Sequence, residues 1–408
     1  KAQRIAEMRF LRGHFHFEAK KIYGSICWID ESVDTKEEFY LVTNSDLSDA
    51  EQWAKIEDDF KAAAQGLPSS QVDEGRPTNM AAKAYLTKCY IFQQKWAEAN
   101  TTADEVISSG AYNLQPNFRD VFLPENDNGT EIIFAVQNTM NDGSPSNYNG
   151  SIGDRLMPPG GPYPGYGFLR PSQNLVNAYK TNVDGLPSMD NVDLTNDDNV
   201  DPRIDHTLAR PGIPYFDLQV YDWTPREASV YGPYSPKKRM ISKNSPYYLP
   251  SWPYVTAVNY YVIRYADLLL WKAEAAIETN DLEAGRQYIN RVRNRAKTSY
   301  YVQTMDGSAD AGNYRINTYD TAFGSKAEAL TALQLERRLE LAHEGHRFFD
   351  LVRWGVAAQV MNDYFTSEKR LRSHLVNAAF VAGKHEYQPI PQSQIDLCQG
   401  NMVQNPNY

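Results

Sequence analysis

Apolar residues recur at helical spacing in the N-terminal part of the chain. The pattern predicts a helix over 2–23, with apolar side chains three or four positions apart along one face. A second helix is expected over 46–65, where Ser45 or Asp46 can cap its first turn. The sequence Gly-Leu-Pro that follows is a stop signal for this helix.

A helix, a short turn and a second helix then follow, in an arrangement that occurs twice. Thr78 is placed to cap a helix that runs to about Gln93, and an antiparallel partner is expected over 96–108. Far downstream, a helix over 262–278 is followed by a turn and by another helix over 282–297. Such pairs indicate a tetratricopeptide-like repeat scaffold, because one pair alone cannot bury its apolar face.

The segment between the two pairs differs in composition. Pro, Gly, Asn, Asp and Tyr dominate it, long helical periods vanish, and 131–136 is its best strand candidate. A long irregular segment within a compact domain is usually functional or disordered. We therefore expect a mainly α single domain over 1–408, made of a helical scaffold (1–110 and 257–362), a loop-rich insert that carries the binding face (111–256) and an irregular C-terminal segment (363–408).

The stretch 336–355, ERRLELAHEGHRFFDLVRWG, predicts a helical hairpin. Gly345 is placed to end the first helix, since glycine adopts the left-handed conformation at low cost. Arg347, Asp350 and Arg353 follow at a spacing that lets them pair along the second helix. Exposed pairs of this kind stabilise a helix by only about 0.2–0.5 kcal/mol each, so the hairpin is interpreted as structural.

The same hairpin contains a near match to a zinc-protease motif. His343, Glu344 and His346 have the right residue types, but the motif needs histidines four positions apart on one helix face. Here the two histidines are only three positions apart, and Gly345 interrupts the helix. We therefore expect no metal site in the hairpin.

Composition narrows the function further. With a formal net charge of −10 the chain is a poor partner for nucleic acid, which needs clustered Lys and Arg. No apolar run approaches the about 18 residues of a membrane-spanning helix.

Cys27, Cys89 and Cys398 have neither a disulfide-framework nor a zinc-ligand spacing. The acidic run 190–201 is rich in oxygen ligands but lacks the EF-hand Gly and closing Glu, so no cofactor is expected and a structural calcium ion is the alternative.

Several stretches of the chain carry a family pattern. They are EMRFLRGHFHFEAKKIYG near the start, LRPSQNLVNAYKTNVDGLP, DPRIDHTLARPGIPYFD and YGPYSPKK in the middle, IRYADLLLWKAEAAIE with YINRVRNRAK, and the hairpin. Together, and in this order, they resemble the SusD/RagB family of outer-membrane glycan-binding lipoproteins. The resemblance implies a mainly α, SusD-like fold and non-catalytic capture of a glycan. It also implies delivery to a SusC-like TonB-dependent transporter, and thus a role in nutrient uptake.

The resemblance further implies a lipid-anchored protein on the extracellular face of the outer membrane. The family begins with a signal peptide and a lipidated cysteine, whereas this chain starts at Lys1 inside a helical pattern. We therefore expect that the natural N-terminus is missing and that the membrane attachment lies outside this chain. Cys27 falls inside folded sequence and is not that anchor.

Sugar rings have apolar C–H faces, so a site for them needs flat aromatic platforms such as Tyr and Trp. The chain has 27 Tyr and 7 Trp, and many of them lie in the loop-rich insert. The candidate ligand contacts are Tyr163, Tyr166, Phe168, Trp223, Tyr248, Trp252 and Tyr254, with Trp28 as a weaker one. The competing interpretation is that these aromatics form small cores for loops with little regular structure.

Three other functions stay open at this point. A glycoside hydrolase on a helical scaffold would need two carboxylates facing each other across a groove, and the sequence does not single out such a pair. A helical repeat can also be a pure protein-interaction scaffold. A member of the same family could carry peptides rather than glycans.

Overall fold

The computed structural model describes residues 1–149, 157, 163–190, 192–222, 224–252 and 254–408. The chain divides into two compact units. We call them the N-terminal unit (Lys1–Val106, Phe348–Asp363 and Ala379–Tyr408) and the central unit (Ile107–Arg347 and Tyr364–Ala378). The downstream repeat helices therefore belong to the same unit as the loop-rich segment.

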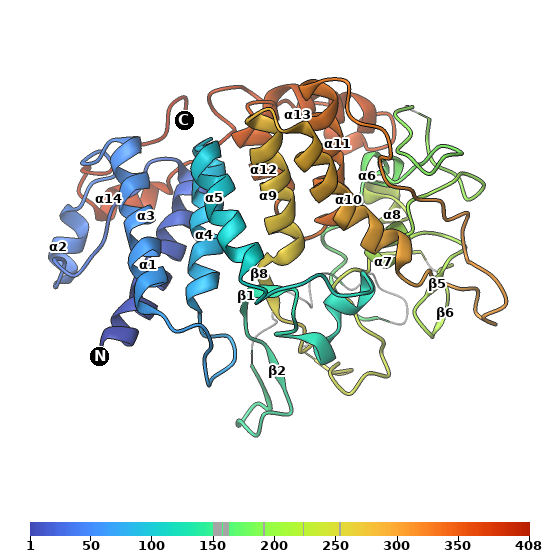
Figure 1. Cartoon of the computed structure of the whole chain (residues 1–408), viewed down its shortest axis with the longest axis horizontal. Helices are drawn as coiled ribbons and strands as arrows, with labels where there is room; N and C mark the ends of the chain where they lie inside the picture. The colour runs from blue at the N-terminus through green and yellow to red at the C-terminus, as the bar shows by residue number, and fades with distance from the viewer. Residues whose placement is uncertain (150–156, 158–162, 191, 223, 253) are drawn as a thin grey trace. The chain divides into compact units, whose positions relative to one another are not determined.

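The chain is mainly helical, with short two-stranded sheets between the helices (Figure 1). The N-terminal unit is built on α1 (Ala2–Tyr23), α2 (Lys36–Leu41), α3 (Asp49–Gly66), α4 (Asn79–Phe92), α5 (Trp96–Ser108), α12 (Arg347–Arg353) and α14 (Gln392–Leu397). The longer helices and strands of the central unit are β1 (Ile132–Val136), β8 (Tyr260–Arg264), α9 (Tyr265–Glu278), α10 (Leu282–Thr298) and α11 (Lys326–Glu340). Helix α13 (Ala357–Glu368) crosses from one unit to the other.

Shorter elements connect these. They are η1 (Arg119–Phe122), η2 (Pro124–Asn126), β2 (Thr139–Met140), β3 (Tyr148–Asn149), α6 (Gln173–Asn177), α7 (Ile204–Thr207), β4 (Leu208–Ala209), β5 (Pro214–Tyr215), β6 (Gln219–Val220), α8 (Ala228–Tyr231), β7 (Ser235–Pro236) and η4 (Ser373–Leu375). All of them except η4 lie between α5 and β8, in the segment that the sequence marks as loop-rich.

In the N-terminal unit, α3 packs against both α1 and α4 around a cluster of aromatic rings. The rings of Phe60 and Tyr85 stack with centroids 4.4 Å apart, and Phe10 meets Phe60 edge to face at 5.6 Å. Gly13 lets the helices approach, because a Cβ there would lie 3.0 Å from the Phe60 ring. The helix predicted over 2–23 forms as α1 with the expected bounds, and these contacts bury one of its faces.

The N-terminal caps of α4 and α3 show which of the predicted helix boundaries are confirmed. Thr78 caps α4 as predicted, and its hydroxyl accepts the Ala81 N–H. Helix α3, however, begins at Asp49 rather than after Ser45 or Asp46. Its cap is Ser48, which forms a capping box with Glu51, so two backbone N–H groups are satisfied reciprocally.

The downstream repeat is confirmed in its helices but not in its first boundary. Helix α9 packs along α10 and α11 in the central unit (Figure 1). Gly285 allows the close crossing, since a Cβ there would lie 2.4 Å from Ile277 Cγ1. The prediction of a helix from Val262 is wrong, because 260–264 form strand β8, which pairs antiparallel with β1. β-branched and aromatic residues favour a strand, and the partner strand lies far away in the sequence.

The hairpin over 336–355 forms two helices with an irregular link. Helix α11 ends at Glu340, earlier than Gly345 would place it, and Gly345 itself takes the left-handed φ of +85° within the link. The predicted pair of Asp350 and Arg353 forms at 2.9 Å, but both side chains are buried rather than exposed. Buried charges cost more to leave unpaired than exposed ones.

A network of buried ion pairs joins α11 to β8 and α10. The Glu340 carboxylate contacts Arg203 and Arg264 at 3.0 Å each, and also Arg295. Glu131, which precedes β1, pairs with Arg264 and Arg295 at 2.5 and 2.9 Å. Because the carboxylates of Glu131 and Glu340 each pair with at least two arginines, the network holds the repeat helices to the strand pair in one arrangement.

Candidate functional site

A row of aromatic rings lies in the central unit, and we call Tyr166, Trp252 and Tyr254 the aromatic ridge; Tyr254 is only partly exposed. Tyr166 and Trp252 keep 39% and 59% of their surface exposed. Their rings meet edge to face with centroids 6.4 Å apart, and Trp252 meets Tyr254 in the same way at 6.0 Å. These contacts fix the rings against one another, while Tyr166 and Trp252 keep a large part of their surface exposed.

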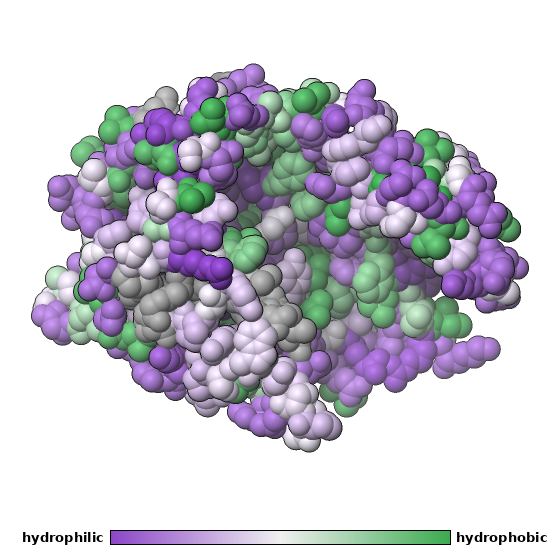
Figure 2. Space-filling view, turned by 180° about the vertical axis from the view of Figure 1, so that it is seen from behind, coloured by the Kyte–Doolittle hydropathy of each residue, from purple (hydrophilic) through white to green (hydrophobic). Residues whose placement is uncertain are grey.

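Phe168 lies two residues beyond Tyr166 in the same loop and is 56% exposed. Leu169 beside it is 61% exposed. An apolar pair that stays in water is costly, so exposure at this place favours a surface that a ligand covers. On the face drawn in Figure 2, hydrophobic side chains occur in small groups between hydrophilic ones.

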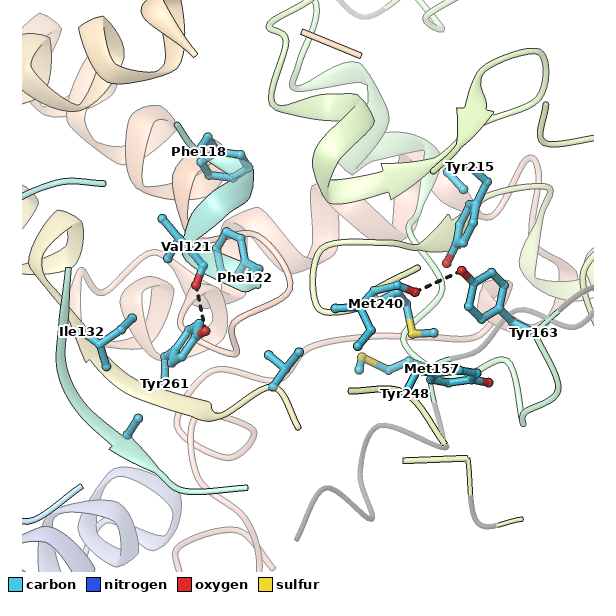
Figure 3. Close-up of a cluster of buried hydrophobic side chains, with 14 of the residues drawn as sticks. Phe118, Val121, Phe122, Ile132, Met157, Tyr163, Tyr215, Met240, Tyr248 and Tyr261 are labelled. Carbon is cyan, nitrogen blue, oxygen red and sulfur yellow. Dashed lines mark hydrogen bonds between the residues drawn. The ribbon is translucent and has the colours of Figure 1, made fainter. Parts of the chain in front are cut away.

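Two of the candidate ligand contacts lie in the hydrophobic core instead (Figure 3). Tyr163 has no exposed surface, and its hydroxyl donates to the Ile241 carbonyl at 3.0 Å while it accepts the Lys243 N–H at 2.9 Å. Tyr248 is 4% exposed and meets Tyr163 edge to face at 5.8 Å. Burial raises the pKa of Tyr248 to about 12. As placed, neither ring presents a face to a ligand, and both serve the core.

Trp28 also has a structural role, in the N-terminal unit. Its indole N–H donates to Asp30 at 3.0 Å, and its ring stacks on His16 with centroids 4.1 Å apart. Arg12 and Lys55 lie over its ring, at 5.2 and 5.3 Å. The remaining candidate, Trp223, lies outside the described residues.

A cavity of about 350 Å³ adjoins the aromatic ridge, and we call it the side pocket. Tyr166 belongs to both, and Phe168 lines the pocket as well. Its other aromatic walls are Tyr231 and Tyr364. Its charged and polar walls are Arg170, Ser172, Glu227, Glu368, Arg372 and His374. The volume lies near the lower end of small-molecule sites, which span about 300–1,000 Å³.

Arg170 holds the walls of the side pocket in place. Its guanidinium donates to the backbone carbonyls of Tyr234, Arg226 and Gly232. Gly232 has a φ of +92°, and a Cβ there would lie 2.0 Å from Arg372 Nη2. Glycine at this position therefore lets the Arg372 side chain lie against the backbone of the pocket wall.

Among the charged side chains that line the side pocket, Glu368 is the most buried, with 2% of its surface exposed. It ends α13, and its Oε1 accepts the Asn174 N–H at 2.5 Å, in the first turn of α6. Its Oε2 has no hydrogen-bond partner among the residues that the structure describes. A buried carboxylate oxygen without a donor is rare in proteins and marks a place where a donor is expected.

Three residues at the ridge and the pocket have a left-handed backbone. Leu169, Glu227 and Tyr254 have φ of +55°, +54° and +59°. Such a conformation costs a residue other than glycine of the order of 1–3 kcal/mol, and it tends to occur at functional sites. Strain at both the ridge and the pocket supports their assignment to one candidate site.

The acidic run from Asp190 to Asp201 is engaged by cationic side chains. Lys180 pairs with Asp190 at 3.3 Å, and Arg203 with Asp201 at 2.7 Å. Within the described ranges, no group of three or more His, Cys, Asp or Glu side chains is placed to hold a metal ion. These pairs therefore account for the described carboxylates at both ends of the run.

Glu344, which lies within the near match to a zinc-protease motif, forms ion pairs with Arg264 and with Lys238, each at 2.6 Å. Burial alone would raise the pKa of Glu344, but the two cations lower it to about 2. Burial also lowers the pKa of His343 to about 4. The segment contributes to the ion network of the core.

Sequence reasoning missed the charged half of the side pocket. Glu368, Arg372 and His374 come from the end of α13 and from the turn beyond it, about 200 positions after Tyr166 in the chain. Their local pattern is that of a solvated helix end, so the sequence carries no signal for a pocket. Only the fold brings them beside the loop that carries Tyr166.

Comparison with known proteins extends these observations. Residues 130–408 match the profile of the SusD family. The chain is 24% identical to the SusD-like protein P25 of Formosa agariphila, across 96% of this chain and 70% of that protein. It is also 24% identical to a SusD-like protein of Bacteroides ovatus, across 91% of this chain and 62% of that protein.

Solved structures share the fold. A SusD-like carbohydrate binding protein from Bacteroides fragilis aligns with a TM-score of 0.77 at 24% identity, over 97% of this chain and 79% of that one. A laminarin binding SusD-like protein aligns at 0.73 and 24% identity, over 100% and 80%. The surface glycan-binding protein A of Bacteroides thetaiotaomicron in complex with laminarihexaose aligns at 0.70 and 22% identity, over 100% and 79%.

Proposed function

Because this chain belongs to the SusD family, we propose that it captures a polysaccharide or oligosaccharide at the cell surface without transforming it. The observation that carries the proposal is the exposed edge-to-face pair of Tyr166 and Trp252. Relatives with the same fold that bind laminarin or laminarihexaose support a carbohydrate as the ligand.

The aromatic ridge suits a sugar chain for physical reasons. A pyranose ring stacks its C–H face on an aromatic ring, and both Tyr and Trp are large and stiff, so little side-chain entropy is lost on binding. Successive rings along the ridge can take successive sugars. Tyr166, Trp252 and Tyr254 are the contacts that we propose, with Phe168 beside them.

Delivery of the glycan is the second part of the proposal. On the family resemblance, the protein is held to the outer face of the outer membrane by an N-terminal lipid and hands its ligand to a SusC-like TonB-dependent transporter. Across the described ranges, none of the helices is both long enough and apolar enough to pass through a membrane. Co-purification with such a transporter tests this part separately.

The test of capture separates it from hydrolysis. Native electrophoresis through gels that contain laminarin, mannan or xylan should retard the protein in at least one gel, while a reducing-end assay detects no product. Release of reducing sugar would favour a glycoside hydrolase, for which Glu227 and Glu368 in the side pocket are the first carboxylates to replace. Retardation in none of the gels would contradict the proposal.

A further inference from the structure

We propose that the side pocket holds one terminal or branching sugar of a neutral glycan, and that Glu368 accepts a hydrogen bond from a hydroxyl group of that sugar. The inference rests on the proposed function, and it names the chemistry that the site selects. The ridge alone would bind any chain with exposed C–H faces, whereas the pocket would distinguish neutral glycans from anionic ones.

The ridge and the pocket are continuous. Tyr166 contacts Trp252 on the ridge and also lines the pocket. A glycan that lies along the ridge therefore reaches the pocket mouth without leaving an aromatic surface. The cavity of about 350 Å³ has room for a small group and not for a long chain, so an end or a branch would enter it.

One oxygen of the Glu368 carboxylate in the pocket lacks a hydrogen-bond donor among the described residues. Glu368 is nine-tenths buried or more, and Asn174 N–H satisfies only its Oε1. Oε2 has no hydrogen-bond partner in the described part of the chain. A buried acceptor that lacks a donor is destabilising, so a group that donates to it gains more than it would in water. Sugar hydroxyl groups are such donors.

The charges of the pocket disfavour an anionic sugar. The pocket has two arginines, Arg170 and Arg372, and two glutamates, Glu227 and Glu368. The Arg170 guanidinium is committed to three backbone carbonyls, so it does not offer a bidentate site for a sugar carboxylate or sulfate. An anionic sugar would also bring its charge close to Glu368, where like charges repel.

The experiment compares wild-type protein with Glu368→Gln. Glutamine keeps the shape and an oxygen for Asn174 N–H, but it places an amide N–H₂ where Oε2 accepts. We expect laminarin, mannan or xylan, whichever retards the wild type most, to bind Glu368→Gln about tenfold or more weakly in calorimetric titration. Glu37→Gln, at an exposed position of α2, is the matched control and should bind as the wild type does.

Each other outcome has a defined meaning. Equal affinity of Glu368→Gln and wild type, with affinity lost in Trp252→Ala, would overturn the pocket inference and leave glycan capture standing. Preference of the wild type for alginate oligosaccharides over every neutral glycan would overturn it too, since an anionic sugar would then be selected. Retention of no glycan at all would overturn both proposals.

Thermal unfolding shows whether Glu368→Gln is folded. If it is not, titration of the wild type with the O-methylated form of the same glycan replaces it, because methylation removes the hydroxyl donors and keeps the sugar rings. Loss of at least tenfold in affinity relative to the unmethylated glycan is the expected result. Unchanged affinity would contradict a hydroxyl bond to Glu368.

Discussion

The rings of Tyr166 and Trp252 meet at 75°, with their centroids 6.4 Å apart, although the two residues come from separate loops of the central unit. Edge-to-face contacts of this kind contribute about 0.5–1.5 kcal/mol beyond the area that they bury. The contact therefore fixes two exposed rings before any ligand arrives, which reduces the entropy lost on binding.

Trp252 should report glycan binding by its own fluorescence. It is 59% exposed, whereas the other described tryptophans are buried or only partly exposed. A saturating glycan that covers Trp252 should shift the emission to shorter wavelength and protect it from acrylamide. Trp252→Phe should lose most of this response while it keeps part of the affinity. An unchanged spectrum of the wild type at saturation would place the glycan away from the ridge.

Tyr163→Phe should lower stability without changing affinity. The substitution removes the hydroxyl that bonds Ile241 O and Lys243 N, and it leaves buried polar groups unsatisfied at a cost of about 1–3 kcal/mol. Urea denaturation measures the loss, and titration with the glycan measures the affinity. A large loss of affinity in a fully folded variant would mean that Tyr163 does contact the ligand.

Glu340→Ala should destabilise the protein strongly. It removes one carboxylate from among Arg203, Arg264 and Arg295, which are all buried. Breaking a buried network by removing one partner costs about 3–5 kcal/mol, because the remaining charges lose their compensation. Glu283→Ala is the control, since it removes an exposed pair with Arg286 and should change the denaturation midpoint little. Equal midpoints for the two variants would contradict this account of the core.

Acid should weaken the same network. Burial alone would raise the pKa of Glu344, but Arg264 and Lys238 lower it from its ordinary value of 4.5 to about 2. The pKa of Glu340 is also lowered, by Arg295, Arg264 and Arg203 against the effect of burial. A lowered pKa in the folded state adds stability above the unfolded pKa, and that stability is lost as pH falls toward the folded pKa.

The free energy of unfolding should therefore decrease between about pH 4.5 and about pH 2. Urea denaturation at a series of pH values measures it, and Glu344→Gln should show a smaller decrease over the same range. A wild-type free energy that stays constant across this window would mean that Glu340 and Glu344 do not have lowered pKa values.

The sequence predicted helices best where local signals agree. The 96–108 helix has the bounds that were expected, and Thr78 is the cap of α4, because capping chemistry depends on neighbours in the chain. The strand at 260–264 was missed because its partner β1 lies more than a hundred residues away. Helical periodicity cannot reveal a pairing of that range.

Candidate site residues were harder to predict for a related reason. Tyr163 and Tyr166 lie in one loop, yet the first is fully buried and the second is 39% exposed. Irregular segments have no repeating period that would show which side chain points inward. Glu368 was not foreseen at all, since only the fold brings the end of α13 beside that loop.

Titration calorimetry of the wild type and of the double variant Tyr166→Ala/Trp252→Ala is the most direct test of whether the aromatic ridge binds a glycan. The glycan is the one that retards the wild type most on native gels, and Phe39→Ala, with 41% exposure outside the ridge, is the matched control. We expect the wild type and Phe39→Ala to bind, and the double variant to lose at least tenfold in affinity, since each ring removed forfeits roughly 1–3 kcal/mol of apolar contact. Equal affinity in the wild type and a folded double variant would contradict it.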